Sequence, residues 1–74
     1  MKNRYDEYIE ALNKEYGLAL TGVSPLMGGK QIPKSAMRIV VKDFGNGLGR
    51  VLYMDAQNRL IANMMEPVEP SQGK

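Results

Sequence analysis

Two glycine-containing runs have residue types that bind phosphate groups in many proteins. Closely spaced glycines let backbone N–H groups approach a phosphate, and a lysine beside them adds positive charge. Gly28-Gly29-Lys30 is followed by Gln31 instead of Ser or Thr, and Ser24 stands where a P-loop has its first glycine. In the second run, Gly45-Asn46-Gly47, Arg50 stands where the dinucleotide-binding pattern has its third glycine. Both departures predict loops and turns rather than nucleotide sites.

Short stretches of the chain also resemble motifs of known families. Asp43, Gly45 and Gly47 form an Asp-x-Gly-x-Gly run that resembles the nucleotide-lid motif of the histidine-kinase and gyrase type ATPases, which need far longer chains. With Val51 after it, the same loop resembles the glycine-rich loop of protein kinases, but the lysine and aspartate that work with that loop are absent. Residues 51–61 are similar to a hairpin of JAB-type domains, whose metal-binding histidines have no counterpart here. These resemblances imply hairpins and transfer no activity.

The chain has no histidine and no cysteine, which removes most arrangements for nucleophilic catalysis. A serine–lysine pair is what remains, but Ser24, Ser35 and Ser71 fall in predicted loops. Asp43 and Asp55 fall near predicted hairpin ends, and no pattern brings them as close as acid–base chemistry requires. Structural zinc is not held by carboxylates alone, and a disulfide is impossible. We therefore expect no enzymatic activity, no cofactor and no metal site.

Positive charge is concentrated in the middle of the chain. Residues 30–59 contain six Lys or Arg against two Asp, a net charge of +4, whereas the whole chain of 74 residues has +2. Such a stretch could follow a nucleic-acid backbone while a tyrosine within it stacks on a base. Ordinary solvated sheets have the same composition, so charge alone leaves the partner open.

An apolar stripe near the N-terminus predicts a helix over residues 3–16. Its members are spaced as on one face of a helix: Tyr5, Tyr8, Ile9, Leu12 and Tyr16. Asn3 is the expected N-cap, and Gly17 can adopt the left-handed conformation that ends a helix. We expect Tyr5 and Tyr16 to lie in the core, while Tyr8 suits either the core or an interface.

The rest of the chain predicts strands and turns. The segment 18–23 is apolar, and three more segments alternate apolar and polar residues: 36–42, 50–54 and 60–64. Residues 24–35 contain two prolines and two glycines and predict a loop. The predicted fold is α+β, with one N-terminal helix packed on a three- or four-stranded antiparallel β-meander. It forms a single domain over residues 1–65, followed by a flexible, disordered tail over residues 66–74.

The helix is expected to cover one face of the sheet and to leave the other open. The covered residues would be Met37, Ile39, Val41, Leu52, Met54, Leu60 and Met64. The open side would mix apolar and cationic residues: Arg38, Val40, Lys42, Val51, Tyr53, Arg59 and Ile61. Both parities of residues 50–54 are apolar, so the buried side of that strand stays undecided. The candidate partner-binding residues are Arg38, Val40, Lys42, Arg50, Tyr53 and Arg59.

The sequence favours a small non-enzymatic binding protein that acts through protein–protein contacts. So short a chain buries too little surface for a wide stability margin, and a partner or oligomerisation is the stabilising device left to it. An inhibitor or regulator of a host protein complex, of the kind that phages and mobile elements encode, fits this description, and a homodimer is a variant. The alternative is a nucleic-acid-binding module on a basic antiparallel sheet face. No signal peptide or membrane span is predicted, so we expect a cytoplasmic protein.

Overall fold

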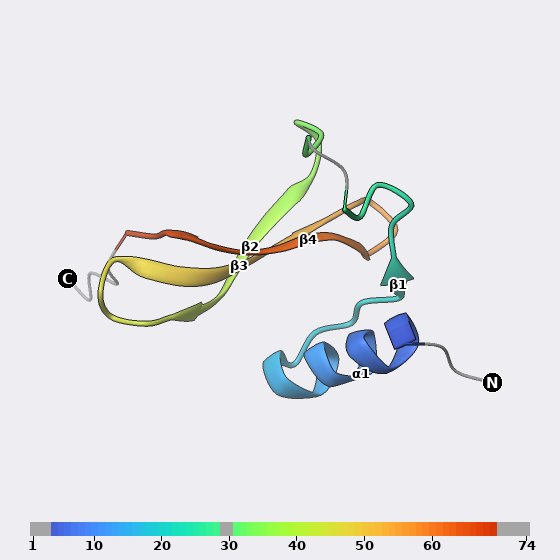
Figure 1. Ribbon diagram of the computed structural model, residues 1–74, viewed down its shortest axis with the longest axis horizontal. Helices are drawn as coiled ribbons and strands as arrows, with labels where there is room; N and C mark the ends of the chain where they lie inside the picture. Colours follow the sequence, from blue (N-terminus) through green and yellow to red (C-terminus); the bar gives the residue numbers. More distant parts are fainter. Residues whose placement is uncertain (1–3, 29–30, 70–74) are drawn as a thin grey trace.

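The computed structural model describes residues 4–28 and 31–69, and its helix matches the predicted one (Figure 1). α1 spans Arg4–Tyr16 and buries Ile9 and Leu12. It ends at Gly17, which has the expected left-handed backbone with φ 67°. The proposed cap, Asn3, lies outside the described residues. No helix in the described part of the chain is long and apolar enough to cross a membrane.

Four strands form one sheet in the order β1-β4-β3-β2. The strands are β1 (Gly22–Val23), β2 (Met37–Asp43), β3 (Leu48–Met54) and β4 (Arg59–Pro67). β2, β3 and β4 form the predicted antiparallel meander. β1 pairs with β4 in parallel, so the sheet of this α+β fold is mixed rather than purely antiparallel.

β1 is shorter than the strand predicted over residues 18–23, because α1 holds the backbone of Leu20. The Asn13 side chain accepts the Leu20 N–H at 2.8 Å and donates to the Leu20 carbonyl at 3.0 Å. These bonds satisfy the Leu20 backbone without a neighbouring strand. Leu20 is therefore buried in the core, and pairing with β4 is limited to Gly22 and Val23.

The loop predicted over residues 24–35 is confirmed for its described residues, 24–28 and 31–35, and it joins β1 to β2 at the opposite edge of the sheet. In Figure 1, α1 lies below the sheet and the turn before β2 lies above it. The loop thus crosses the side of the sheet that α1 leaves uncovered. Ser24 is buried at the start of the loop, and its hydroxyl accepts the Leu26 N–H at 3.1 Å.

The core lies between α1 and the sheet. Its members come from the helix, the segment after it and two strands: Ile9, Leu12, Leu20, Leu52, Met54 and Leu60. Burial of a side chain such as Leu52 stabilises the fold by about 1.5–3 kcal/mol. Tyr16 packs beside this core as predicted, but Tyr5 is 57% exposed and its predicted core position is wrong. The two-residue β1 is too short to cover the first turn of α1.

A β-bulge in β2 changes the side of the sheet on which Lys42 lies. The β2–β3 register shifts between Val40 and Lys42, leaving Val41 as the extra residue. An extra residue reverses the alternation of faces beyond it. Lys42 therefore pairs with Arg50 on the helix side, which corrects its predicted place on the open side.

A second bulge, in β4, has the same effect on Met64. Met54 pairs with Leu60 and Tyr53 with Ala62, so one residue of β4 is inserted between them. Met64 then pairs with Val51, on the side of the sheet away from α1. Its predicted place under the helix is wrong, because strict alternation along residues 60–64 does not show an inserted residue.

β4 continues beyond its predicted end. Glu66 pairs with Gly49, and the Val68 N–H bonds the Gly47 carbonyl at 2.9 Å. The prediction of a solvated tail from Glu66 is therefore wrong for residues 66–68. Pro67 is tolerated because this is an edge strand, where a missing N–H need not break a ladder bond. Residues 70–74 of the predicted tail lie outside the described residues.

Candidate protein-interaction face

The side of the sheet away from α1 is organised in three cross-strand rows. Pairing among β2, β3 and β4 sets these rows as Arg38–Tyr53–Ala62, Val40–Val51–Met64 and Asp43–Gly49–Glu66. We call the residues of the three rows the open face. The middle row, which we call the apolar row, has no polar side chain, and the outer rows place polar side chains on both sides of it.

Arg38, Tyr53 and Glu66 form a polar bridge across the open face. The Arg38 guanidinium pairs with the Glu66 carboxylate at 3.1 Å, and the Tyr53 hydroxyl lies 2.9 Å and 3.0 Å from the two oxygens of that carboxylate. Hydrogen bonding to Tyr53, and then to Glu66, raises the pKa of Arg38 above its usual value. Because Arg38 and Glu66 lie in opposite outer rows on β2 and β4, their ion pair passes over the centre of β3.

Val51 lies at that centre and has no exposed surface. No helix among the described residues covers this side, and the polar bridge spans the row to which Val51 belongs, so the polar bridge and the row neighbours contribute to its cover. Those neighbours, Val40 and Met64, are 43% and 38% exposed. The open face thus presents an apolar side chain on either side of the polar bridge. A hollow of about 440 Å³ adjoins it, lined by Arg38, Val40, Asp43, Pro67, Val68 and Glu69.

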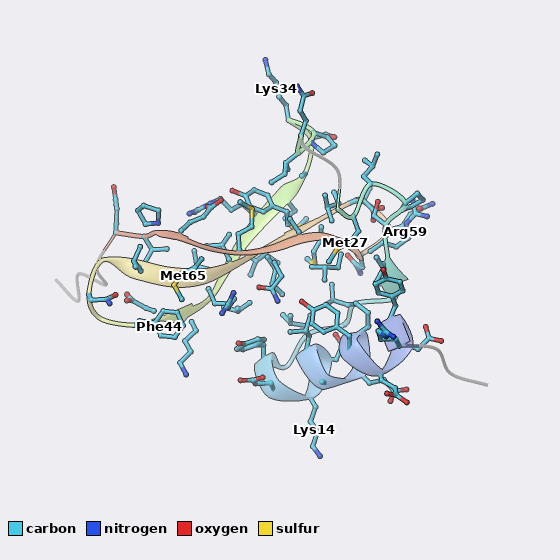
Figure 2. All side chains as sticks on the ribbon, in the orientation of Figure 1. Lys14, Met27, Lys34, Phe44, Arg59 and Met65 are labelled. Carbon is cyan, nitrogen blue, oxygen red and sulfur yellow. The ribbon has the colours of Figure 1, made fainter. Side chains whose placement is uncertain are left out.

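The candidate residues taken from the sequence do not all meet on this face. Arg38, Val40 and Tyr53 do, but Lys42 and Arg50 lie on the helix side. Arg50 donates to the Asn63 side-chain oxygen at 3.2 Å, and the Asn63 amide donates to the Tyr8 hydroxyl of α1. The Lys42 ammonium lies 5.4 Å from the centre of the Phe44 ring. Figure 2 shows Phe44 and Met65 in this region, beyond the end of α1.

Arg59, the remaining candidate, is the first residue of β4, directly after the turn between β3 and β4. Its guanidinium Nε pairs with one Asp55 carboxylate oxygen at 2.8 Å, and its backbone N–H donates to the other at 2.9 Å. The backbone hydrogen bond from Arg59 first, and its side chain after that, lower the pKa of Asp55. Asn58 in the same turn has φ 63°, so the predicted turn is confirmed and Arg59 helps to fix it.

The glycine-rich run forms the predicted turn between β2 and β3. Gly45 and Gly47 have φ values of 82° and 87°, which favour glycine. The Asp43 carboxylate accepts the Gly45 N–H at 2.8 Å, and the Asn46 side chain accepts the Leu48 N–H at 3.1 Å. Local oxygen atoms therefore occupy two of the N–H groups that a phosphate would need, and one of those oxygens is negatively charged.

Two residues of the open face are absent from the sequence-based set. The sequence predicts Met64 in the core and Glu66 in the tail, but Met64 lies beside the polar bridge and Glu66 forms part of it. The sequence does contain a pattern that indicates their place. Ala62, Met64 and Glu66 are each two residues apart, so a strand that continues to Pro67 sets all three on one face.

Neither metal-binding groups nor similarity to known proteins indicates a function. Among residues 4–28 and 31–69, no three His, Cys, Asp or Glu side chains are grouped so as to hold a metal ion. Comparison of the chain with known protein families, curated proteins and solved structures gave no match.

Proposed function

We propose that this protein is a small binding module that contacts a protein partner through its open face. The observation that carries the proposal is the apolar row, exposed at both ends and crossed by the polar bridge. Exposed apolar side chains beside a tyrosine and an arginine are typical of the centres of protein interfaces. A partner with an apolar centre and polar groups around it fits this surface.

The pairing of charges favours a protein over a polyanion. Nucleic-acid binding depends on cations that are free to neutralise phosphates. Arg38 is paired with Glu66 and Arg59 with Asp55, so these cations are locally compensated. The nucleic-acid alternative then rests on Lys42 and Arg50, which lie on the other side of the sheet. It has less support than the sequence alone gave it.

We also propose what binding does to the partner. Arg38, Tyr53 and Glu66 are engaged with one another, and Asp43 with the adjacent turn, which suits recognition rather than chemistry on a substrate. A module that acts by occupying the surface of its partner is an inhibitor or a regulator. We therefore propose that class, and a host protein complex as the kind of target that the sequence suggests.

The test is affinity capture from a lysate of the native host, with a matched pair of variants. Val40 and Met37 are exposed apolar residues of β2 on opposite sides of the sheet, at 43% and 53%. We expect Val40→Glu to lose a captured protein that the wild-type chain and Met37→Glu both retain. Circular dichroism of each variant checks that the fold is kept.

Nuclease treatment of a parallel sample separates the two kinds of partner. A protein that survives nuclease and is lost with Val40→Glu agrees with the proposal. If both variants retain the partner, the open face is not the contact surface. Recovery of nucleic acid, with proteins lost after nuclease and with a steep dependence on salt, would replace the proposal by the alternative.

A further inference from the structure

One edge of the sheet lacks a neighbouring strand over most of its length. β1 pairs with β4 at Arg59 and Leu60, and the loop residues that follow line a groove with β4 without forming a strand. Residues 61–67 of β4 have β3 on one side and no strand of the described residues on the other. Such an edge presents unpaired N–H and C=O groups and serves as a template for another strand unless it is protected.

The two edges of the sheet differ in their protection. β2 has the bulge at Val41 and the exposed charged side chains of Arg38 and Lys42. Bulges and charged residues are devices by which natural sheets prevent pairing at an edge. β4 has a bulge as well, at residue 61, and Pro67 near its other end, but residues 62–65 between them include no charged residue, and Met65 is 51% exposed. The β4 edge is therefore the open one of the two.

The register shows which backbone groups of β4 point outward. The Leu48 carbonyl accepts a hydrogen bond from the residue that follows β2, so Leu48 faces β2 and Gly49 faces β4. This direction alternates along an antiparallel ladder. Glu66, opposite Gly49, therefore faces β3, and the backbones of Asn63 and Met65 face the unpaired side.

We propose that two copies of this chain pair through these edges, β4 against β4 and antiparallel, about a two-fold axis at Met65. The two Met65 backbones then exchange hydrogen bonds, and each Asn63 N–H reaches the Pro67 carbonyl of the other copy. Pro67 has no N–H, so this position leaves no donor unpaired. In this register residues 62–65 meet residues 65–68 of the second copy, where the one charged side chain, Glu66, stands opposite Met64.

An apolar groove lies where the second copy would run. It has a volume of about 330 Å³ and is formed by β4 with Leu26, Met27 and Ile32 of the loop. In the proposed register, Val68 of the second copy lies opposite Ala62, which lines this groove. The groove thus receives an apolar side chain from the copy that pairs with the edge.

The dimer goes beyond the proposed function, because it uses an edge of the sheet rather than the open face. The two-fold axis is perpendicular to the sheet, so both helices lie on one side and both open faces on the other. A joined pair of meanders therefore presents two copies of the apolar row side by side. Partner binding gains from two linked contact surfaces, since the second contact becomes intramolecular.

Sedimentation equilibrium of the full chain at several concentrations tests the proposal. Met65→Lys sets two positive charges at the axis, and Met37→Lys is its control, because Met37 is an exposed methionine on the helix side of the other edge. We expect a wild-type dimer, an unchanged Met37→Lys dimer and a dissociation constant at least about tenfold higher for Met65→Lys. Circular dichroism confirms that each variant is folded.

Amide hydrogen exchange of the wild-type chain gives a second readout that needs no variant. The N–H groups of Asn63 and Met65 should exchange more slowly as the protein concentration rises, because they are bonded in the dimer alone. A wild-type monomer overturns the proposal and leaves the edge to a strand of another protein. A dimer that Met65→Lys leaves intact, or that Met37→Lys dissociates, also overturns it. If monomeric Met65→Lys still captures the same partner, the proposed function holds without the dimer.

Discussion

The two sides of the sheet bury neighbouring residues of β3 by different means. Leu52 faces α1 and Val51 belongs to the open face, and neither has any exposed surface. Leu52 is covered by the apolar side chains of a packed helix. Val51 is covered by the polar bridge, whose arginine and glutamate extend across the sheet from the strands on either side. Long polar side chains can cover an apolar residue while their charged ends stay near water.

The two kinds of cover differ in what must move to remove them. Removing the cover from Leu52 requires α1 to leave the sheet, which amounts to unfolding this small domain. Removing the cover from Val51 requires rotation of exposed side chains, and rotamer changes are fast. The helix side therefore holds the fold together. Under the proposed function, the open face exchanges its own polar bridge for contacts with a partner.

The largest expected effect is on the free energy of unfolding of the matched variants Leu52→Ala and Val51→Ala. We expect Leu52→Ala to lower it by about 2–5 kcal/mol, because the packed helix cannot fill the cavity. Val51→Ala should lower it by about 1–2 kcal/mol, since the two carbon atoms removed are worth roughly 0.8 kcal/mol each and the side chains of the polar bridge can move into the space that they leave. Urea denaturation measures both. Equal losses would show that the cover on the two sides is equally rigid.

The next effect concerns Gly49, which lies in an outer row of the open face without a side chain. A Cβ atom there would lie 2.6 Å from the Lys42 carbonyl oxygen and 3.0 Å from the Val68 methyl groups. We expect Gly49→Ala to destabilise the fold by about 1–3 kcal/mol, because backbone must move. The double variant with Val68→Ala should regain a minor part of this loss. Full recovery would mean that Val68, and not the backbone of β2, limits the space.

The sequence predicts the helix side better than the open face, and the reason is the range of the interactions. The apolar stripe of α1 is local, so its period identifies Ile9 and Leu12 as core residues and Gly17 as the helix end. The three-stranded meander also follows from local alternation and turn residues. The parallel pairing of β1 is different, because it joins Gly22 and Val23 to Arg59 and Leu60, which lie far along the chain.

The open face depends on features that alternation does not show. The residue inserted in β2 places Lys42 on the helix side of the sheet, and the residue inserted in β4 places Met64 on the open face. The ion pair between Arg38 and Glu66 joins residues 28 positions apart, so no local motif encodes it. Arg38, Val40 and Tyr53 were nevertheless placed together correctly, because they precede the bulge of β2 or lie in the regular β3.

The smallest expected effect tests how firmly the polar bridge is held. Glu66→Gln keeps the shape of the side chain and removes its charge, so the ion pair with Arg38 is lost while the Tyr53 hydroxyl retains an acceptor. Because the pair is partly exposed, we expect the free energy of unfolding to fall by no more than about 1 kcal/mol. The difference from wild type should shrink at high salt, where exposed charges are screened.

Glu69→Gln is the matched control for that measurement, because Glu69 is exposed three residues further on and takes no part in the polar bridge. It should leave stability unchanged at both salt concentrations. If Glu66→Gln destabilised the fold by several kcal/mol independently of salt, the polar bridge would be a fixed part of the core. The open face could then not exchange its bridge for a partner at small cost, and recognition would have to use the exposed ends of the apolar row with the bridge left in place.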